Sequence, residues 1–94
     1  MSLGASHFSD RSSGEWFALW SSDQESMLAT RIRNLAADID AGYSPTGVSV
    51  RNQLADIADA RNSVLAQYTR LGAMTIDERG RWCFDDMKRR GVIE

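Results

Sequence analysis

Few side chains in this sequence could carry out acid–base, nucleophilic or metal chemistry. His7 is the only histidine and lies in a small, polar N-terminal segment, whereas Cys83, the only cysteine, lies on the apolar stripe of the last predicted helix. This pair cannot supply a structural zinc site, and a buried thiol acts as a small hydrophobic side chain. Asp56 and Asp59 lie one turn apart, but solvation and the arginines of the same segment account for them. Because phosphate-loop, HExxH, CxxC and Gly-x-Ser-x-Gly motifs are also absent from the sequence, we expect a protein that is not an enzyme and uses no metal ion or cofactor.

Tryptophan and arginine offer a different chemistry, because they are enriched at the energetic centres of protein interfaces. At about 100° per residue, Trp82 lies about 120° from the apolar stripe of its helix, among charged residues. One interpretation makes Trp82 an interface anchor, with Arg79 and Arg89 beside it. The other has Trp82 cover the N-terminal segment or stack on one of these arginines within the chain.

A second aromatic group lies near the N-terminus and includes Trp16 and Trp20. These tryptophans are either part of the core or an exposed peptide that docks on a partner. The register of the predicted helices favours the core.

Length and composition limit the chain to one small globular domain. It has 94 residues, of which 43% are hydrophobic and 26% are charged. No apolar run approaches the roughly 20 residues that a membrane helix needs, so we expect a cytoplasmic protein without a membrane partner. The net charge of −2 argues against a protein that coats nucleic acid through bulk positive charge.

The periodicity of apolar residues predicts helices and no strands. The expected helices span residues 15–20, 23–41, 49–71 and 76–90, and together they form one domain over residues 14–94. Residues 1–13 are expected to be a flexible leader, and Met1–Leu3 look like the remnant of an expression vector.

Local motifs set the expected helix ends. A serine or threonine stands three residues before a glutamate, the spacing of a capping box, at Ser12/Glu15, Ser22/Glu25 and Thr75/Glu78. The second box predicts a break near Ser21 and Ser22, although one helix could also run through. Ser49 is expected to cap the third helix, and glycines follow the second and fourth. The last helix also carries the acid-first i,i+4 pairs Asp77/Arg81, Asp85/Arg89 and Asp86/Arg90.

The turn around Pro45 predicts an antiparallel pairing of the two longest helices. In the expected register the facing pairs are Ile39/Val50, Leu35/Leu54 and Ile32/Ile57. The next pair sets Arg61 against Leu28, which places a guanidinium in the middle of an apolar stripe. A charge there needs a partner, in the core or at a subunit boundary, and Glu25 is the first choice by register.

The C-terminal stretch 84–94, FDDMKRRGVIE, has an apolar pair three residues apart, a basic turn and then Gly91-Val92-Ile93. It resembles the end of the recognition helix in winged-helix DNA-binding proteins, where such a sequence leads into the wing. The resemblance covers this stretch alone and implies a small DNA-binding regulator that uses the last helix. A basic helix end capped by glycine produces the same sequence and is the alternative.

These observations favour an all-α, antiparallel three-helix bundle with a short N-terminal aromatic helical segment. We expect it to act as a non-catalytic interaction or oligomerisation module. A core of this size gains from further burial, so self-association as a homodimer is the expected partnership, with another protein as the alternative.

Overall fold

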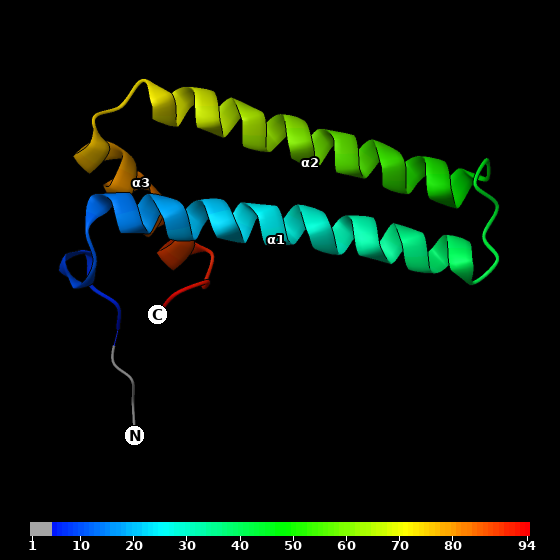
Figure 1. Ribbon diagram of the computed structural model, residues 1–94, viewed down its shortest axis with the longest axis horizontal. Helices are drawn as coiled ribbons and strands as arrows, with labels where there is room; N and C mark the ends of the chain where they lie inside the picture. Colours follow the sequence, from blue (N-terminus) through cyan, green and yellow to red (C-terminus); the bar gives the residue numbers. More distant parts are fainter. Residues whose placement is uncertain (1–4) are drawn as a thin grey trace. The chain divides into compact units, whose positions relative to one another are not determined.

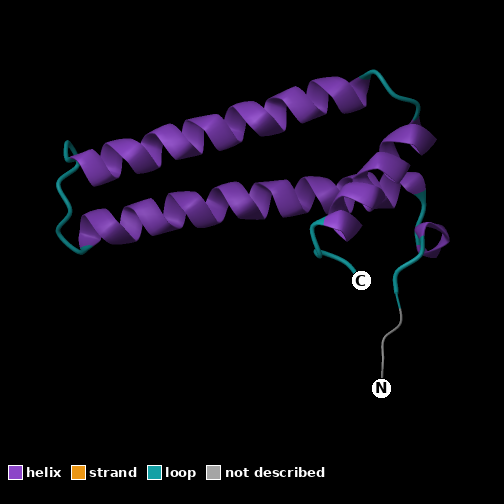
Figure 2. Cartoon of the chain, turned by 180° about the vertical axis from the view of Figure 1, so that it is seen from behind, coloured by secondary structure: helices purple, strands orange, loops and turns teal. Residues whose placement is uncertain are grey.

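The computed structural model describes residues 5–94 as three α-helices preceded by a single 3-10 turn (Figure 1). The elements are η1 (Phe8–Asp10), α1 (Ser13–Asp40), α2 (Val48–Gly72) and α3 (Ile76–Arg89). No strand occurs among the described residues (Figure 2). The predicted all-α class with three helices is confirmed. Met1–Leu3, which we interpreted as the remnant of an expression vector, lie outside the residues that the structure describes.

Two of the three predicted capping boxes start helices. The Ser12 hydroxyl accepts a hydrogen bond from the backbone N–H of Glu15 and donates one to its carboxylate, and α1 begins at the next residue. Thr75 and Glu78 form the reciprocal box at the start of α3. Each box satisfies backbone donors that the first helical turn would otherwise leave unpaired.

The predicted break at Ser21 and Ser22 is wrong, because α1 is one helix from Ser13 to Asp40. Serine weakens a helix interior only slightly. The burial of Trp16 and Trp20, each 1% exposed, holds the helix on the N-terminal side of the two serines. Tertiary packing therefore outweighs the local capping signal.

Glycines end helices where expected, but α2 starts earlier than predicted. Gly42 and Gly91 adopt positive φ angles of 105° and 76° after α1 and α3. The hydrogen bonds from Tyr43 to Asp38 and from Gly42 to Ile39 close a Schellman motif. At α2 the Arg51 N–H donates to the Gly47 carbonyl, so Gly47 and not Ser49 precedes the helix.

The described chain contains two compact units, which we treat separately. The head unit holds the N-terminal residues up to Asp23 together with Arg70–Glu94, and the hairpin unit is Gln24–Thr69. The expectation of one domain over 14–94 stays a prediction.

The head unit has an aromatic core. Its fully or nearly buried residues are Trp16, Trp20, Leu71, Gly80, Cys83, Phe84 and Met87. The Trp16 and Phe84 rings lie 4.8 Å apart between centroids, and Phe8 packs edge-on against Phe84 at 5.8 Å. These ring contacts join the N-terminal segment, α1 and α3.

The N-terminal segment from residue 5 onward makes hydrogen bonds with α1 and α3 of the head unit, and the flexible leader over residues 1–13 stays a prediction. The Trp16 indole N–H donates to the Phe8 carbonyl at 2.7 Å, and the Lys88 ammonium donates to the Ser6 carbonyl at 2.8 Å. The Phe8 ring also packs against Phe84 on α3, and this apolar contact anchors the segment to the head unit.

The hairpin unit consists of the antiparallel parts of α1 and α2 and the turn between them, which lie side by side in both overall views (Figures 1 and 2). Leu35 and Val50 are its buried apolar residues. The Gln53 amide donates to the Asp38 carboxylate at 2.7 Å across the two helices. Two helices alone can enclose only this narrow seam.

Candidate interaction surface

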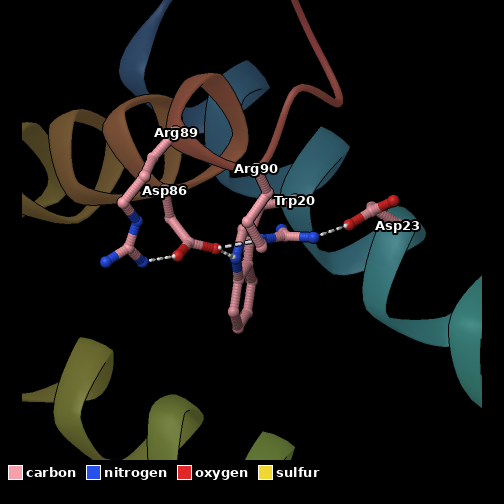
Figure 3. A network of polar contacts seen from close by, with 5 residues as sticks. All are labelled: Trp20, Asp23, Asp86, Arg89 and Arg90. Carbon is pink, nitrogen blue, oxygen red and sulfur yellow. Dashed lines mark hydrogen bonds and ion pairs between the residues drawn. The ribbon is translucent and has the colours of Figure 1, made fainter.

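A polar network in the head unit joins the start of α1 to the end of α3 (Figure 3). The Asp86 carboxylate accepts hydrogen bonds from the Trp20 indole N–H at 3.0 Å, from Arg90 at 2.9 Å and from Arg89. Arg90 also reaches Asp23 at 3.0 Å. The predicted Asp86/Arg90 pair is confirmed, whereas Arg89 pairs with Asp86 instead of Asp85.

These contacts fix the charge state of Asp86. Burial alone would raise the pKa of this carboxyl, but the hydrogen bonds from Trp20, Arg89 and Arg90 outweigh burial and hold the pKa below its ordinary value. The carboxylate is therefore charged and bonded to three donors. Such a group stabilises the fold and has little basicity left for proton transfer.

Trp82 lies against the head unit's own core and is half-buried. Its ring meets Trp20 edge-on at 5.7 Å between centroids, and the Arg70 guanidinium lies 5.8 Å from its ring centre. The structure thus favours packing within the chain, with Arg70 as the cation instead of Arg79 or Arg89. An interface role for Trp82 stays a prediction.

Arg79 has a structural role in the head unit. Its guanidinium donates to the carbonyls of Leu71 at 3.0 Å and Met74 at 3.3 Å, at and just beyond the end of α2, and lies 5.2 Å from the Phe17 ring centre. A cation at a helix C-terminus satisfies carbonyls that have no partner in the helix.

Trp16 and Trp20 belong to the core, as the helix register favoured. At 1% exposure neither can serve as an exposed docking peptide, so that alternative is wrong. The indole N–H of each donates a hydrogen bond within the head unit, which makes full burial possible.

The basic residues near the end of α3 also have partners within the chain. Arg90 and Arg89 bind carboxylates, Lys88 binds the Ser6 carbonyl, and Arg81 pairs with Asp85 at 3.4 Å. A DNA-binding helix needs such groups free to reach phosphates and base edges. The DNA-binding alternative stays a prediction that these contacts do not favour.

Glu25 and Arg61 do not form the predicted buried pair. Both side chains are exposed in the hairpin unit, and the ion pairs within the described residues do not include either of them. The physical reason is that a two-helix hairpin leaves the sides of its seam open to water. Although Arg61 lies in the middle of the apolar stripe, its guanidinium therefore stays solvated.

The hairpin unit has two unlike faces. One face is hollowed: a polar hollow of about 150 Å³ is lined by Arg31, Asn34, Gln53, Asp56 and Ile57, and a second lies beside it. At about 100° per residue, the other side of the seam carries Ile32, Ile39, Leu54 and Leu65. These four side chains are 53%, 36%, 50% and 47% exposed. We call this set, with the nearby Glu25 and Arg61, the apolar face.

This face was not predicted from the sequence, because the apolar stripes alone do not show which of their residues the partner helix leaves exposed. The breadth of the stripes was the available signal. Leu54 and Leu65 lie on one flank of the α2 stripe, so a single partner helix cannot cover both the stripe and that flank.

Residues 5–94 contain one buried thiol and no group of three or more His, Cys, Asp or Glu side chains that could hold a metal ion. Cys83 is fully buried, and burial raises the pKa of its thiol to about 12. Among the described helices, none combines the length and apolar character that a membrane span requires.

Comparison with known proteins adds no relative. No family model, curated protein or solved structure matches the chain.

Proposed function

We propose that the protein is a non-catalytic self-association module and that the apolar face of the hairpin unit is its contact surface. The observation that carries this proposal is the exposure of Ile32, Ile39, Leu54 and Leu65 on one side of two paired helices. Exposed apolar patches of this kind are typical of interaction sites. A second hairpin would cover the patch and complete a four-helix arrangement.

The test is the molar mass of the whole chain in solution. We expect light scattering across a concentration series to show a dimer that dissociates on dilution. Leu54→Glu would place a charge in the contact and should weaken association by at least about tenfold, a cost of about 1.4 kcal/mol. Ile76→Glu is the matched control, because Ile76 is 66% exposed but belongs to the head unit.

Equal effects of these two variants would contradict the assignment of the surface. If the wild-type chain stays monomeric at protein concentrations up to about 100 times a micromolar dimer Kd, that is about 100 μM, self-association is refuted.

A further inference from the structure

From the packing of the N-terminal segment in the head unit, we infer that α1 and α3 form a binding site for a peptide segment with an aromatic side chain, and that residues 5–11 occupy this site in the structure. We call residues 5–11 the strap. The inference goes beyond self-association through the apolar face, because it concerns a different surface and a different partner.

The strap has one apolar anchor, Phe8. Its ring packs edge-on against Phe84 of α3 at 5.8 Å between centroids. The Arg81 guanidinium lies 5.1 Å from the Phe8 ring centre and 5.7 Å from that of Phe84. A cation over an aromatic ring is attracted by the electrons of that ring, an attraction that an aliphatic side chain lacks. The site therefore favours an aromatic side chain at this position.

The hydrogen bonds that join the strap to the rest of the head unit use the backbone of the strap. The Trp16 indole N–H donates to the Phe8 carbonyl at 2.7 Å. The Lys88 ammonium donates to the Ser6 carbonyl at 2.8 Å, and the Ser6 N–H donates to the Glu94 carbonyl. Because almost every residue type carries these backbone groups, the three bonds fix the position of a peptide without selecting its sequence.

A turn within the strap presents Phe8 to the site. The Asp10 carboxylate accepts a hydrogen bond from the His7 N–H at 2.8 Å, and the Asp10 N–H donates to the His7 carbonyl at 3.0 Å. Both bonds lie within the strap, so a separate peptide of the same sequence can form the same turn. A turn that forms in the free peptide lowers the ordering cost of binding.

The surface beneath the strap needs an occupant. With the strap in place, Trp16 is 1% exposed and Phe84 is 4% exposed. Removal of the strap would open aromatic surface to water and take the acceptor from the Trp16 indole N–H. A peptide that covers the rings and offers a carbonyl to this N–H would restore both contacts.

The strap makes few enough contacts for another peptide to compete with it. None of the residues of η1 is fully buried. Segments with few buried contacts open locally at low free-energy cost. A tethered segment acts at an effective concentration in the millimolar range, so its occupancy of the site requires a lower Kd for the same segment as a separate peptide, about 0.1 mM.

A peptide titration of the full-length chain tests the inference. The probe is a synthetic peptide with the sequence of residues 5–11, ASHFSDR, blocked at both ends. Phe8→Ala removes the anchor from the chain's own strap, so this variant should bind the probe with a Kd of about 0.1 mM. The wild-type chain should bind the probe at least about tenfold more weakly, because its own strap occupies the site.

The indole N–H signals in heteronuclear NMR spectra report on the site itself. Phe8→Ala should shift the Trp16 signal, because this indole loses its ordered acceptor. The probe should move the signal back toward its wild-type position. Trp20 donates to Asp86 instead, so its signal is the internal control and should stay in place.

Two controls isolate the anchor. Ser9→Ala changes an exposed residue of the strap, so this variant should bind the probe as weakly as wild type does. A probe with the Phe8→Ala substitution should bind at least about tenfold more weakly than the unchanged probe, as expected when a buried aromatic anchor is truncated. Circular dichroism checks the helix content of each chain. If Phe8→Ala loses helix content, Phe8→Leu takes its place, because leucine keeps an apolar contact and removes the ring.

Failure of the variant to bind the probe at concentrations up to about 1 mM, ten times the expected Kd, overturns the inference. Equal binding by wild type and Phe8→Ala also overturns it. Light scattering separates this site from the apolar face, since Phe8→Ala should self-associate as wild type does. If Phe8→Ala is monomeric while wild type dimerises, the strap binds a second copy and the inference is wrong. The titration decides the inference even where a monomeric wild type refutes self-association.

Discussion

Ser13 and Gly80 bring the backbones of α1 and α3 close together in the head unit. A side-chain carbon at Gly80 would lie 2.5 Å from the Cα of Ser13 and 2.6 Å from its carbonyl oxygen. These atoms belong to the backbone of α1, so they cannot move aside as a flexible side chain could. The hydrogen bond from the Ser13 hydroxyl to Asp77, at 3.0 Å, joins the same two helices.

Gly80→Ala should therefore destabilise the protein, although alanine favours a helix. We expect the free energy of unfolding to fall by about 1 to 3 kcal/mol, the usual cost of overpacking a tight contact. Gly14→Ala is the matched control, because nothing lies within 4 Å of a methyl group there. It should gain up to about 1 kcal/mol from helix propensity. Denaturant titration of both variants checks the difference, and equal stabilities would mean that the two helices can separate without cost.

Asp86→Asn should lower the free energy of unfolding at neutral pH. It should also make that free energy change less as the pH falls. The folded pKa of Asp86 lies below its ordinary value of 3.8, so the unfolded chain binds the proton more tightly. The stabilisation is thus complete above the unfolded pKa and is lost as the pH falls through the folded pKa. Removing the charge should cost about 1.5 to 3 kcal/mol at pH 7, the range for hydrogen bonds to charged groups.

Urea titrations at pH 7 and at pH 2 to 3 measure this effect, since the difference between wild type and Asp86→Asn should shrink in acid. Asp85→Asn is the control: its side chain is 58% exposed, and its pair with Arg81 is a surface salt bridge. Such pairs contribute about 0 to 1 kcal/mol. An unchanged difference at both pH values would contradict a structural role for the Asp86 charge.

Features set by neighbouring residues could be predicted from the sequence. The capping boxes at Ser12 and Thr75 and the glycine ends at Gly42 and Gly91 involve partners at most five residues apart. The apolar stripes depend on helical periodicity alone. Their presence was enough to predict an all-α chain.

Features that depend on distant partners were predicted only in part. Asp86 and Arg90 are one turn apart and were paired correctly, but Trp20 and Asp23 reach the same network from 66 and 67 residues away. The unbroken α1 has the same origin, since burial of Trp20 against distant residues offsets the weak propensity of Ser21 and Ser22. Glu25 and Arg61 show the converse: their positions along the helices were predicted, but burial requires a cover that one hairpin lacks.

Cys83 should be nearly unreactive in the folded protein and reactive once the head unit opens. The thiolate is the nucleophile, and a pKa of about 12 in place of 9.0 lowers its population at pH 8 by roughly a thousandfold. Burial adds a steric block, since Cys83 is 0% exposed. We expect iodoacetamide labelling, followed by mass spectrometry, to be complete in denaturant and very slow in buffer. Gly80→Ala should speed labelling in buffer, because the altered helix lies on the core that covers the thiol. Equal labelling rates with and without denaturant would contradict the buried position of Cys83.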